Sequence, residues 1–213
     1  MCAHFESIRD PERFKAFFKL ELPEKALFDV WPSYESTFIR LKTANTQERD
    51  ISNNFESLTG SFGLIPHWSK DTKIARHTYN ARIETVADKP SFKDAWRLKR
   101  LCIIPAEAIY EPDWKSGKAI STKIFRADLK PLGIAGIWTG WRAPSGEILR
   151  SFSMLTINAD EHALMQRFHK PGEEKRMVAI LDENDYFNWL QSTDDSCLKY
   201  IKPFEANLLT TRF

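Results

Sequence analysis

The sequence predicts an α+β protein with a mainly antiparallel, curved, barrel-like sheet and short flanking helices, in a single domain over residues 1–213. Short segments rich in β-branched and aromatic residues recur along the chain between turn signals, as they do in β-rich folds. The helical patterns are short and do not alternate regularly with the strands, which argues against a parallel α/β sheet. The 213 residues, 42% of them hydrophobic, are enough to bury one sizeable core.

The N-terminal half is expected to contain most of the helical patterns. Asp10 followed by Pro11 is typical of an N-cap and a first helical residue, and the apolar spacing continues this helix to about Leu20. A polar loop is expected over residues 45–54, between two strands. Short helices are expected over 78–85 and 89–96, and strands over 37–41, 55–64, 101–104 and 106–114.

The C-terminal half is expected to be dominated by strands. A hairpin signal at 115–118 and a second turn at 143–146 separate them. Asp182 is a candidate N-cap for a last helix that ends near Gln191. Strands are expected over 119–126, 132–141, 149–157 and 176–181, with a short helix over 159–168 and an edge strand after Phe204.

The composition excludes several classes of protein. No apolar run approaches the ~20 residues that span a bilayer, and the N-terminus lacks the layout of a secretion signal, so no membrane association and a cytoplasmic location are expected. Three widely spaced cysteines indicate neither a disulfide framework nor a zinc site. A net charge of +2 means that any surface for nucleic acid must be local.

The N-terminus carries the most distinctive chemistry of the chain. Cys2 is small enough for an aminopeptidase to remove Met1, so the mature chain is expected to begin with a cysteine. Its α-amine and thiol then form a 1,2-aminothiol. Such a pair captures an aldehyde first as a Schiff base and then, through attack by sulfur, as a thiazolidine ring. An α-amine has a pKa of about 7.7–8.0, so much of it is neutral near pH 7.

Several stretches, in this order and at this spacing, are similar to the motifs of one family. They are Met1-Cys2, Gly63-Leu64-Ile65-Pro66-His67-Trp68, Asn80-Ala81-Arg82-Ile83-Glu84-Thr85, Cys102-Ile103-Ile104-Pro105-Ala106 with Tyr110-Glu111, and His169 ahead of Arg176-Met177-Val178. Over nearly its whole length the chain resembles the SOS-response-associated peptidase (SRAP) family, which includes proteins that shield abasic sites. The resemblance implies an SRAP-like monomer, without metal or cofactor, that crosslinks to abasic sites in single-stranded DNA.

The resemblance also assigns catalytic roles. Cys2 resembles the crosslinking nucleophile, and Asn80 resembles the asparagine that holds the reacting centre. Glu111 resembles the carboxylate beside the Cys2 amine, and His169 the histidine that assists proton transfers. Because the same imine can also undergo β-elimination, the resemblance implies lyase activity as a secondary outcome.

The DNA contacts expected from the resemblance involve different side chains. Arg82 resembles an arginine that faces a phosphate, for which a guanidinium fork is well suited. Trp68 and Pro32 resemble residues that line the DNA cleft. His4, Lys70 and Arg176 are expected on the same surface.

The chain differs from the family pattern at three places near these residues. The family begins Cys-Gly-Arg-Phe, whereas Ala3 and His4 follow Cys2 here, so an arginine is replaced. Asp29 stands where the family has asparagine. The compact His-Asp-Arg-Met-Pro of the family is expanded to the stretch from His169 to Val178.

Other interpretations of the same residues stay open. An N-terminal-cysteine peptidase that removes its own leader uses the same Cys2, and a noncatalytic module for single-stranded nucleic acid needs only the basic and aromatic residues. A free α-amine on Cys2, with a histidine at the third position of the mature chain, is also a pattern that can bind Cu²⁺ or Ni²⁺. Arg82 and Glu111 are also compatible with surface and ion-pair roles, and His169 with the end of a helix.

Overall fold

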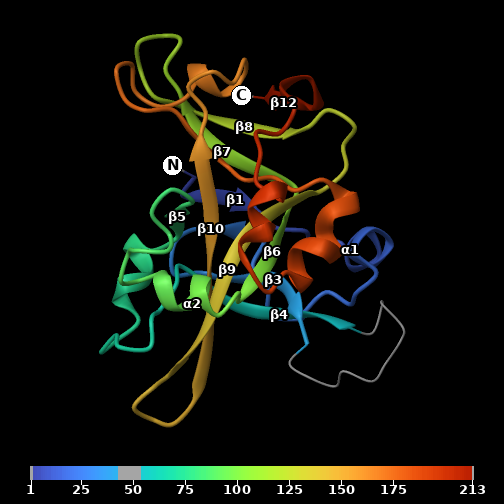
Figure 1. The fold of residues 1–213 in the computed structure, drawn as a ribbon. Helices are drawn as coiled ribbons and strands as arrows, with labels where there is room; N and C mark the ends of the chain where they lie inside the picture. The colour runs from blue at the N-terminus through green and yellow to red at the C-terminus, as the bar shows by residue number, and fades with distance from the viewer. Residues whose placement is uncertain (1, 43–53, 213) are drawn as a thin grey trace.

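The strands form two sheets that share one core (Figure 1). The computed structural model describes residues 2–42 and 54–212. The strands are β1 (His4–Glu6), β2 (Asp29–Val30), β3 (Glu35–Leu41), β4 (Phe55–Phe62), β5 (Asn80–Arg82), β6 (Leu101–Ala106), β7 (Ala108–Asp113), β8 (Ile120–Arg126), β9 (Leu132–Arg142), β10 (Ile148–Asn158), β11 (Arg176–Val178) and β12 (Leu209–Arg212).

Five strands of the larger sheet close into a barrel. β10 pairs with β4, β4 with β3, β3 with β6, β6 with β9, and β9 returns to β10. All of these pairings are antiparallel except β10 with β4. Figure 1 shows β9 and β10 crossing the molecule as a long hairpin. Towards its C-terminal end, β10 also pairs with β5 and β11, and Asn80 of β5 bonds to the backbone of Cys2.

The second sheet has the order β12-β8-β7-β1-β2. β1 is only three residues long but has a neighbour on both sides, with His4 opposite Tyr110 in β7 and Phe5 opposite Val30 in β2. An inner strand makes two ladders of hydrogen bonds, so this short segment is fixed in position. The sheet therefore holds the backbone that follows Cys2.

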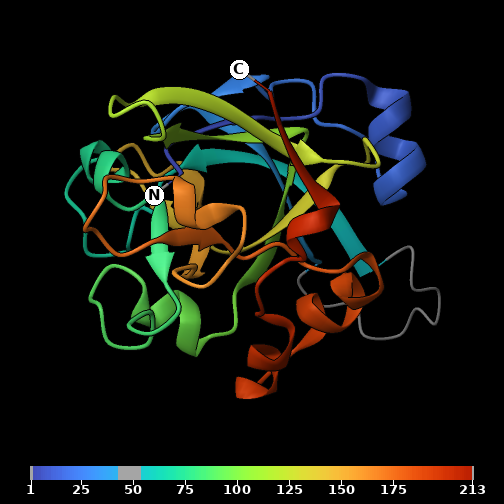
Figure 2. The same ribbon diagram turned by 90° about the horizontal axis from the view of Figure 1, so that it is seen from above.

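The helices are short and lie around the barrel. They are α1 (Pro11–Phe18), α2 (Lys93–Arg97) and α3 (Tyr186–Gln191), with 3₁₀ turns η2 (Lys73–His77), η3 (Met165–Arg167), η4 (Glu183–Asp185), η5 (Asp195–Tyr200) and η6 (Ala206–Leu208). Figures 1 and 2 both place α1 and α3 on the side away from β5. Figure 1 shows α2 on the opposite side from α1. Phe18 and Tyr186 join them through stacked rings, with centroids 5.9 Å apart.

A line of phenylalanine rings connects the two sheets through the core. Phe5 of β1 meets Phe62 of β4 edge to face at 5.1 Å between centroids. Phe62 stacks on Phe152 of β10 at 5.7 Å, and Phe152 contacts Phe38 of β3 at 5.6 Å. All four side chains are fully buried. Such aromatic contacts add about 0.5–1.5 kcal/mol each to the burial of their surface, so the core ties β1 to the barrel.

Most of the elements expected from the sequence are confirmed. The fold class is α+β with a mainly antiparallel, barrel-like sheet, and the strands expected along the chain are present with small shifts at their ends. Asp10 caps α1 by accepting a hydrogen bond from the Glu12 amide at 2.9 Å. The tail forms β12 at the edge of its sheet, as expected. The polar loop expected over 45–54 lies outside the described residues, apart from Asn54.

Three helix predictions need correction. The helix expected over 78–85 is wrong, because Asn80–Arg82 pairs with β10 as β5, and pairing to an available strand edge overrides a weak local preference. The helix expected over 159–168 is reduced to η3. The helix expected from residue 89 begins only at Lys93, and Asp182 caps η4, which precedes α3.

None of the helices within residues 2–42 and 54–212 is long and apolar enough to cross a membrane.

Gly63 provides a test of how tightly the chain after β4 packs against η2. Its φ is +121°, and a Cβ added there would lie 2.0 Å from the carbonyl oxygen of Ala75. We expect Gly63→Ala to lower the free energy of unfolding by about 1–3 kcal/mol more than Gly117→Ala does. Gly117 also has a positive φ, +78°, but has open space around it.

Urea unfolding of the two variants measures the difference. The control accounts for placing an alanine at a positive φ, so equal losses would show that neither the close contact with Ala75 nor the φ of +121° adds to the cost.

Candidate functional site around Cys2

Cys2 lies two residues ahead of the His4–Tyr110 pair and is completely buried. Its Sγ donates a weak hydrogen bond to the His4 carbonyl oxygen at 3.3 Å. Burial, with the negative charge of Glu111 adding to it, raises the pKa of the Cys2 thiol to about 12. The thiol is therefore protonated near neutral pH and needs a base before it can act as a nucleophile.

Asn80 holds the backbone of Cys2 from the barrel side. β5 pairs in parallel with β10, with Asn80 opposite Met154, and this register fixes the amide. Its Nδ2 donates to the Cys2 carbonyl oxygen at 2.7 Å. The Asn80 Oδ1 is buried, and within the part of the chain that the structure describes no donor reaches it. The amide therefore orients Cys2 and directs an acceptor into the site.

Glu111 follows Tyr110 on β7, and its side chain is 1% exposed. Burial raises the pKa of this carboxyl group to about 7. A carboxyl group with this pKa can both donate and accept a proton near neutral pH, which an ordinary glutamate does inefficiently. Glu111 is therefore suited to acid–base chemistry at Cys2.

His169 is placed by contacts with two strands. Its amide donates to the Pro112 carbonyl oxygen at 3.1 Å, and its ring Nε2 donates to the Arg176 carbonyl oxygen at 2.9 Å. Since a carbonyl only accepts, Nε2 carries the proton, and a neutral ring then presents Nδ1 as an acceptor. Burial lowers the pKa of His169, which favours the neutral ring. Nδ1 lies 3.8 Å from Glu111 Oε2.

The backbone at His169 is also unusual, with φ of +63°. A residue other than glycine rarely adopts this region, and such conformations occur at functional sites more often than elsewhere. This turn brings the ring beside the end of β7. Cys2, Asn80, Glu111 and His169, which the sequence assigned to one site, thus converge from four segments.

His4 is enclosed by aromatic rings. It stacks between Trp31 and Tyr110, with ring centroids 4.2 and 4.1 Å away and planes within 12°. Its Nε2 also contacts the carboxylate of Asp29. The His4 side chain is only 16% exposed. In this arrangement the ring anchors the start of β1.

Arg82 and Arg176 are both held by carboxylates. Arg82 is half-exposed and donates to Glu174 at 2.8 Å. The Arg176 side chain is 3% exposed and forms a bidentate pair with Glu84, at 2.9 and 2.8 Å, as well as a bond to Glu174 at 2.7 Å. Arg176 therefore has a structural role, whereas Arg82 keeps an exposed side.

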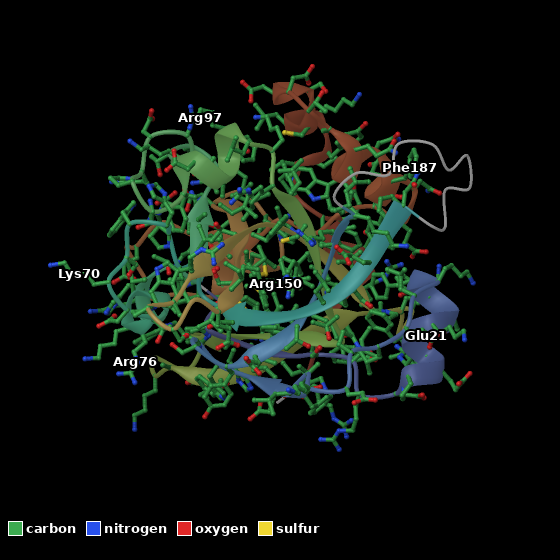
Figure 3. All side chains as sticks on the ribbon, turned by 90° about the horizontal axis from the view of Figure 1, so that it is seen from below. Glu21, Lys70, Arg76, Arg97, Arg150 and Phe187 are labelled. Carbon is green, nitrogen blue, oxygen red and sulfur yellow. The ribbon has the colours of Figure 1, made fainter. Side chains whose placement is uncertain are left out.

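The remaining predicted DNA contacts lie at the surface. Trp68 is 48% exposed, and its Nε1 donates to the Pro90 carbonyl oxygen at 3.3 Å. Lys70 is exposed, and Figure 3 shows its side chain at the periphery, directed away from the body. Pro32 is half-buried in the turn closed by the Tyr34 amide and the Trp31 carbonyl, 2.9 Å apart.

Three residues at the site had no role assigned from the sequence. Tyr110 and Trp31 form the ring stack, and Glu174 pairs with the arginines. The signal for Tyr110 was its place beside Glu111, but its contact with His4 depends on the pairing of β1 with β7. No group of three or more His, Cys, Asp or Glu side chains that could hold a metal occurs among residues 2–42 and 54–212.

These features define an α+β barrel protein with an acid–base site around a buried cysteine at position 2. Residues 1–212 match the model of the SOS response associated peptidase (SRAP) family, and the chain belongs to this family.

Its relatives include proteins named for abasic sites. The chain is 36% identical over 152 residues to the abasic site processing protein YoqW of Bacillus subtilis, a match that covers 68% of this chain and 63% of YoqW. It is 28% identical over 179 residues to the mouse abasic site processing protein HMCES, covering 68% of this chain and 48% of HMCES. The chain thus spans about half to two thirds of the length of these relatives.

Solved structures agree on the fold. A protein from Bordetella bronchiseptica superimposes with a TM-score of 0.87 at 40% identity, covering 99% of this chain and 98% of that protein. A protein from Bacteroides thetaiotaomicron superimposes with a TM-score of 0.79 at 23% identity, over 99% of this chain and 90% of that protein.

The raised pKa of Glu111 predicts a specific dependence of stability on pH. The folded protein holds this proton to about pH 7, whereas the unfolded chain loses it near 4.5. Ionisation therefore costs stability increasingly as the pH rises through this window, by on the order of 3 kcal/mol above it. We expect Glu111→Gln to gain stability relative to the wild type between pH 4.5 and 7, as measured by urea unfolding.

Glu24→Gln, at an exposed position, controls for the loss of one negative charge. A difference between Glu111→Gln and the wild type that stays constant from pH 4.5 to pH 8 would contradict this assignment.

Proposed function

We propose that this protein captures abasic sites in single-stranded DNA by forming a thiazolidine through Cys2, after removal of Met1. The observation that carries the proposal is the cluster of Asn80, Glu111 and His169 around a buried Cys2. The names of the relatives, which refer to abasic sites, support the same substrate. An abasic nucleotide that is unpaired leaves the base stack at low cost, which suits a buried nucleophile.

The reaction begins at the amine. The neutral α-amine attacks the open-chain sugar aldehyde, and the resulting carbinolamine loses water when an acid protonates its hydroxyl group. Glu111, with a pKa near 7, is suited to donate that proton. The product is an imine between Cys2 and the sugar carbon.

The thiol then closes the ring. Sulfur forms a bond to the imine carbon, the electrons of the C=N bond move to nitrogen, and the thiol proton is transferred to that nitrogen. His169 Nδ1 or the ionised Glu111 accepts the proton from a thiol whose pKa is about 12. The attack is intramolecular, with an effective molarity of about 10⁵ M or more in good geometry. The adduct forms with loss of one water molecule.

Contacts with the rest of the strand use the exposed residues. Arg82 lies two residues beyond Asn80 on β5 and offers a guanidinium to a phosphate. Trp68 presents a half-exposed ring for stacking on a base. Pro32 and Lys70 also contact the strand. The His4 ring contributes indirectly, because its stacking holds β1 in position.

Intact mass spectrometry of the protein mixed with an abasic-site oligonucleotide tests the capture. We expect a heat-stable adduct at the summed mass less one water. Cys2→Ala keeps an α-amine but loses the thiol, so it should yield an adduct only when borohydride reduces the imine. Cys102→Ala, which removes another buried thiol, should react as the wild type does.

A heat-stable adduct of Cys2→Ala without reductant would show that sulfur takes no part. No adduct with the wild-type protein would refute covalent capture and leave a noncatalytic binding module. Cleavage of the strand by the wild type would reveal the lyase branch of the same imine.

The peptidase activity in the family's description raises the question of how Met1 leaves. If the site removes its own leader, Glu111→Gln made in a cell-free mixture without aminopeptidase should keep Met1, whereas the wild type should lose it. Mapping the first residue of both chains by mass spectrometry measures this. Loss of Met1 from both would show that Glu111 is not needed for the cleavage.

A further inference from the structure

A carboxylate bridges two guanidinium groups beside the site. Glu174 Oε2 accepts a hydrogen bond from Arg82 Nη1 at 2.8 Å, and Glu174 Oε1 accepts one from Arg176 Nη1 at 2.7 Å. Asn158 Nδ2 lies 3.4 Å from the same Oε1. Hydrogen bonding to Arg176 lowers the pKa of Glu174, so this carboxylate is ionised near neutral pH.

This arrangement is the one in which a phosphate group binds to arginine. Two oxygens of one anion each accept from a different guanidinium, and charge-assisted bonds of this length are formed equally well by carboxylates and phosphates. The two arginines differ in what else holds them. The Arg176 side chain is 3% exposed and is also paired with Glu84, whereas that of Arg82 is 47% exposed. Arg82 is therefore the cation that an incoming anion can reach.

Arg82 also has the right position relative to Cys2. Residues two apart on a strand share a face and lie about 6.6 Å apart, so Arg82 is on the same face of β5 as Asn80. Asn80 bonds to the Cys2 carbonyl oxygen at 2.7 Å. A sugar at Cys2 would therefore bring one of its flanking phosphates close to Arg82.

We propose that Glu174 occupies the position of a DNA phosphate at Arg82, so that a strand must displace this carboxylate before it binds. The inference rests on the proposed function in one respect, which is that the strand runs past Arg82. Glu174 thereby sets how tightly the protein holds intact single strands. It reduces binding to undamaged DNA and leaves capture of the aldehyde to Cys2.

The surroundings of Glu174 allow it to leave. Its side chain is 37% exposed and belongs to the loop between His169 and β11. Lys175 Nζ bonds to the carbonyl oxygens of His169 and Lys170, at 3.1 and 2.9 Å, so the loop backbone is held independently of Glu174. The exposed pair with Arg82 is weak, worth at most about 1 kcal/mol. Arg176 loses one bond when Glu174 turns away but keeps its two bonds to Glu84, at 2.9 and 2.8 Å. Displacement therefore needs only a rotation of the side chain.

The test compares Glu174→Gln with Glu173→Gln. Both variants remove one negative charge from the same loop, but Glu173 is exposed and forms no ion pair with any residue of 2–42 and 54–212. The measurement is the equilibrium Kd for a fluorescent, undamaged single-stranded oligonucleotide at fixed ionic strength. We expect Glu174→Gln to bind roughly two- to fivefold more tightly than Glu173→Gln.

A double-mutant cycle then identifies the partner. In an Arg82→Gln background the advantage of Glu174→Gln over Glu173→Gln should disappear, since the arginine that Glu174 covers is absent. An advantage that persists would overturn the proposal, because Glu174 would then act on another group. Equal affinities of Glu174→Gln and Glu173→Gln in the original background would also overturn it, because bulk charge would explain the effect.

Melting temperatures of the four variants check that each is folded. Should Glu174→Gln fail to fold, Glu174→Ala replaces it and is held to the same comparison. The result of this binding experiment does not depend on covalent capture, because the oligonucleotide contains no abasic site. A protein that shows the Glu174 effect but no adduct would refute covalent capture alone.

Discussion

The position of the three-residue strand β1 between β7 and β2 is the constraint on which the site depends. A segment this short has little stability of its own, so ladders on both sides and the fully buried Phe5 must hold it. The ring of His4 between Trp31 and Tyr110 adds a third anchor. With β1 fixed, Cys2 is held beside Asn80 and Glu111.

Burial at this position gives the site its chemistry. The same exclusion of water that raises the pKa of the Cys2 thiol to about 12 raises that of Glu111 to about 7 and lowers that of His169. In the proposed reaction, a protonated thiol beside a carboxyl group that titrates near neutrality is consistent with an order in which the amine reacts first and sulfur second. The energetic cost of keeping Glu111 in the core is thus what suits this group to the acid and base roles of the proposed reaction.

Local patterns predicted the fold class and the longer strands, but not the short strands β1 and β2. The family motifs pointed to Asn80, Glu111 and His169, which lie together around Cys2, and the chemical roles of these residues stay predictions. The prediction failed at Asn80–Arg82, where a helix was expected, since the strand forms only through pairing with residues of β10 that lie 74 positions further along the chain. For the same reason, the contact between His4 and Tyr110 could not be predicted, since it depends on the pairing of β1 with β7. The sequence also did not predict the carboxylates that pair with Arg82 and Arg176, because an ion pair between distant segments leaves no periodic pattern in the sequence.

Two of the places where the chain departs from the family pattern have the same physical effect. At the first, a histidine replaces an arginine and is stacked and paired with Asp29. At the second, the expanded loop after His169 supplies Glu174, which neutralises Arg82. Each departure pairs within the protein a group that would otherwise face solvent, and each therefore reduces the charge available to a phosphate backbone. A site built in this way would hold DNA weakly until a covalent bond forms. Under the proposed function, discrimination would then rest on the aldehyde, which only a damaged strand provides.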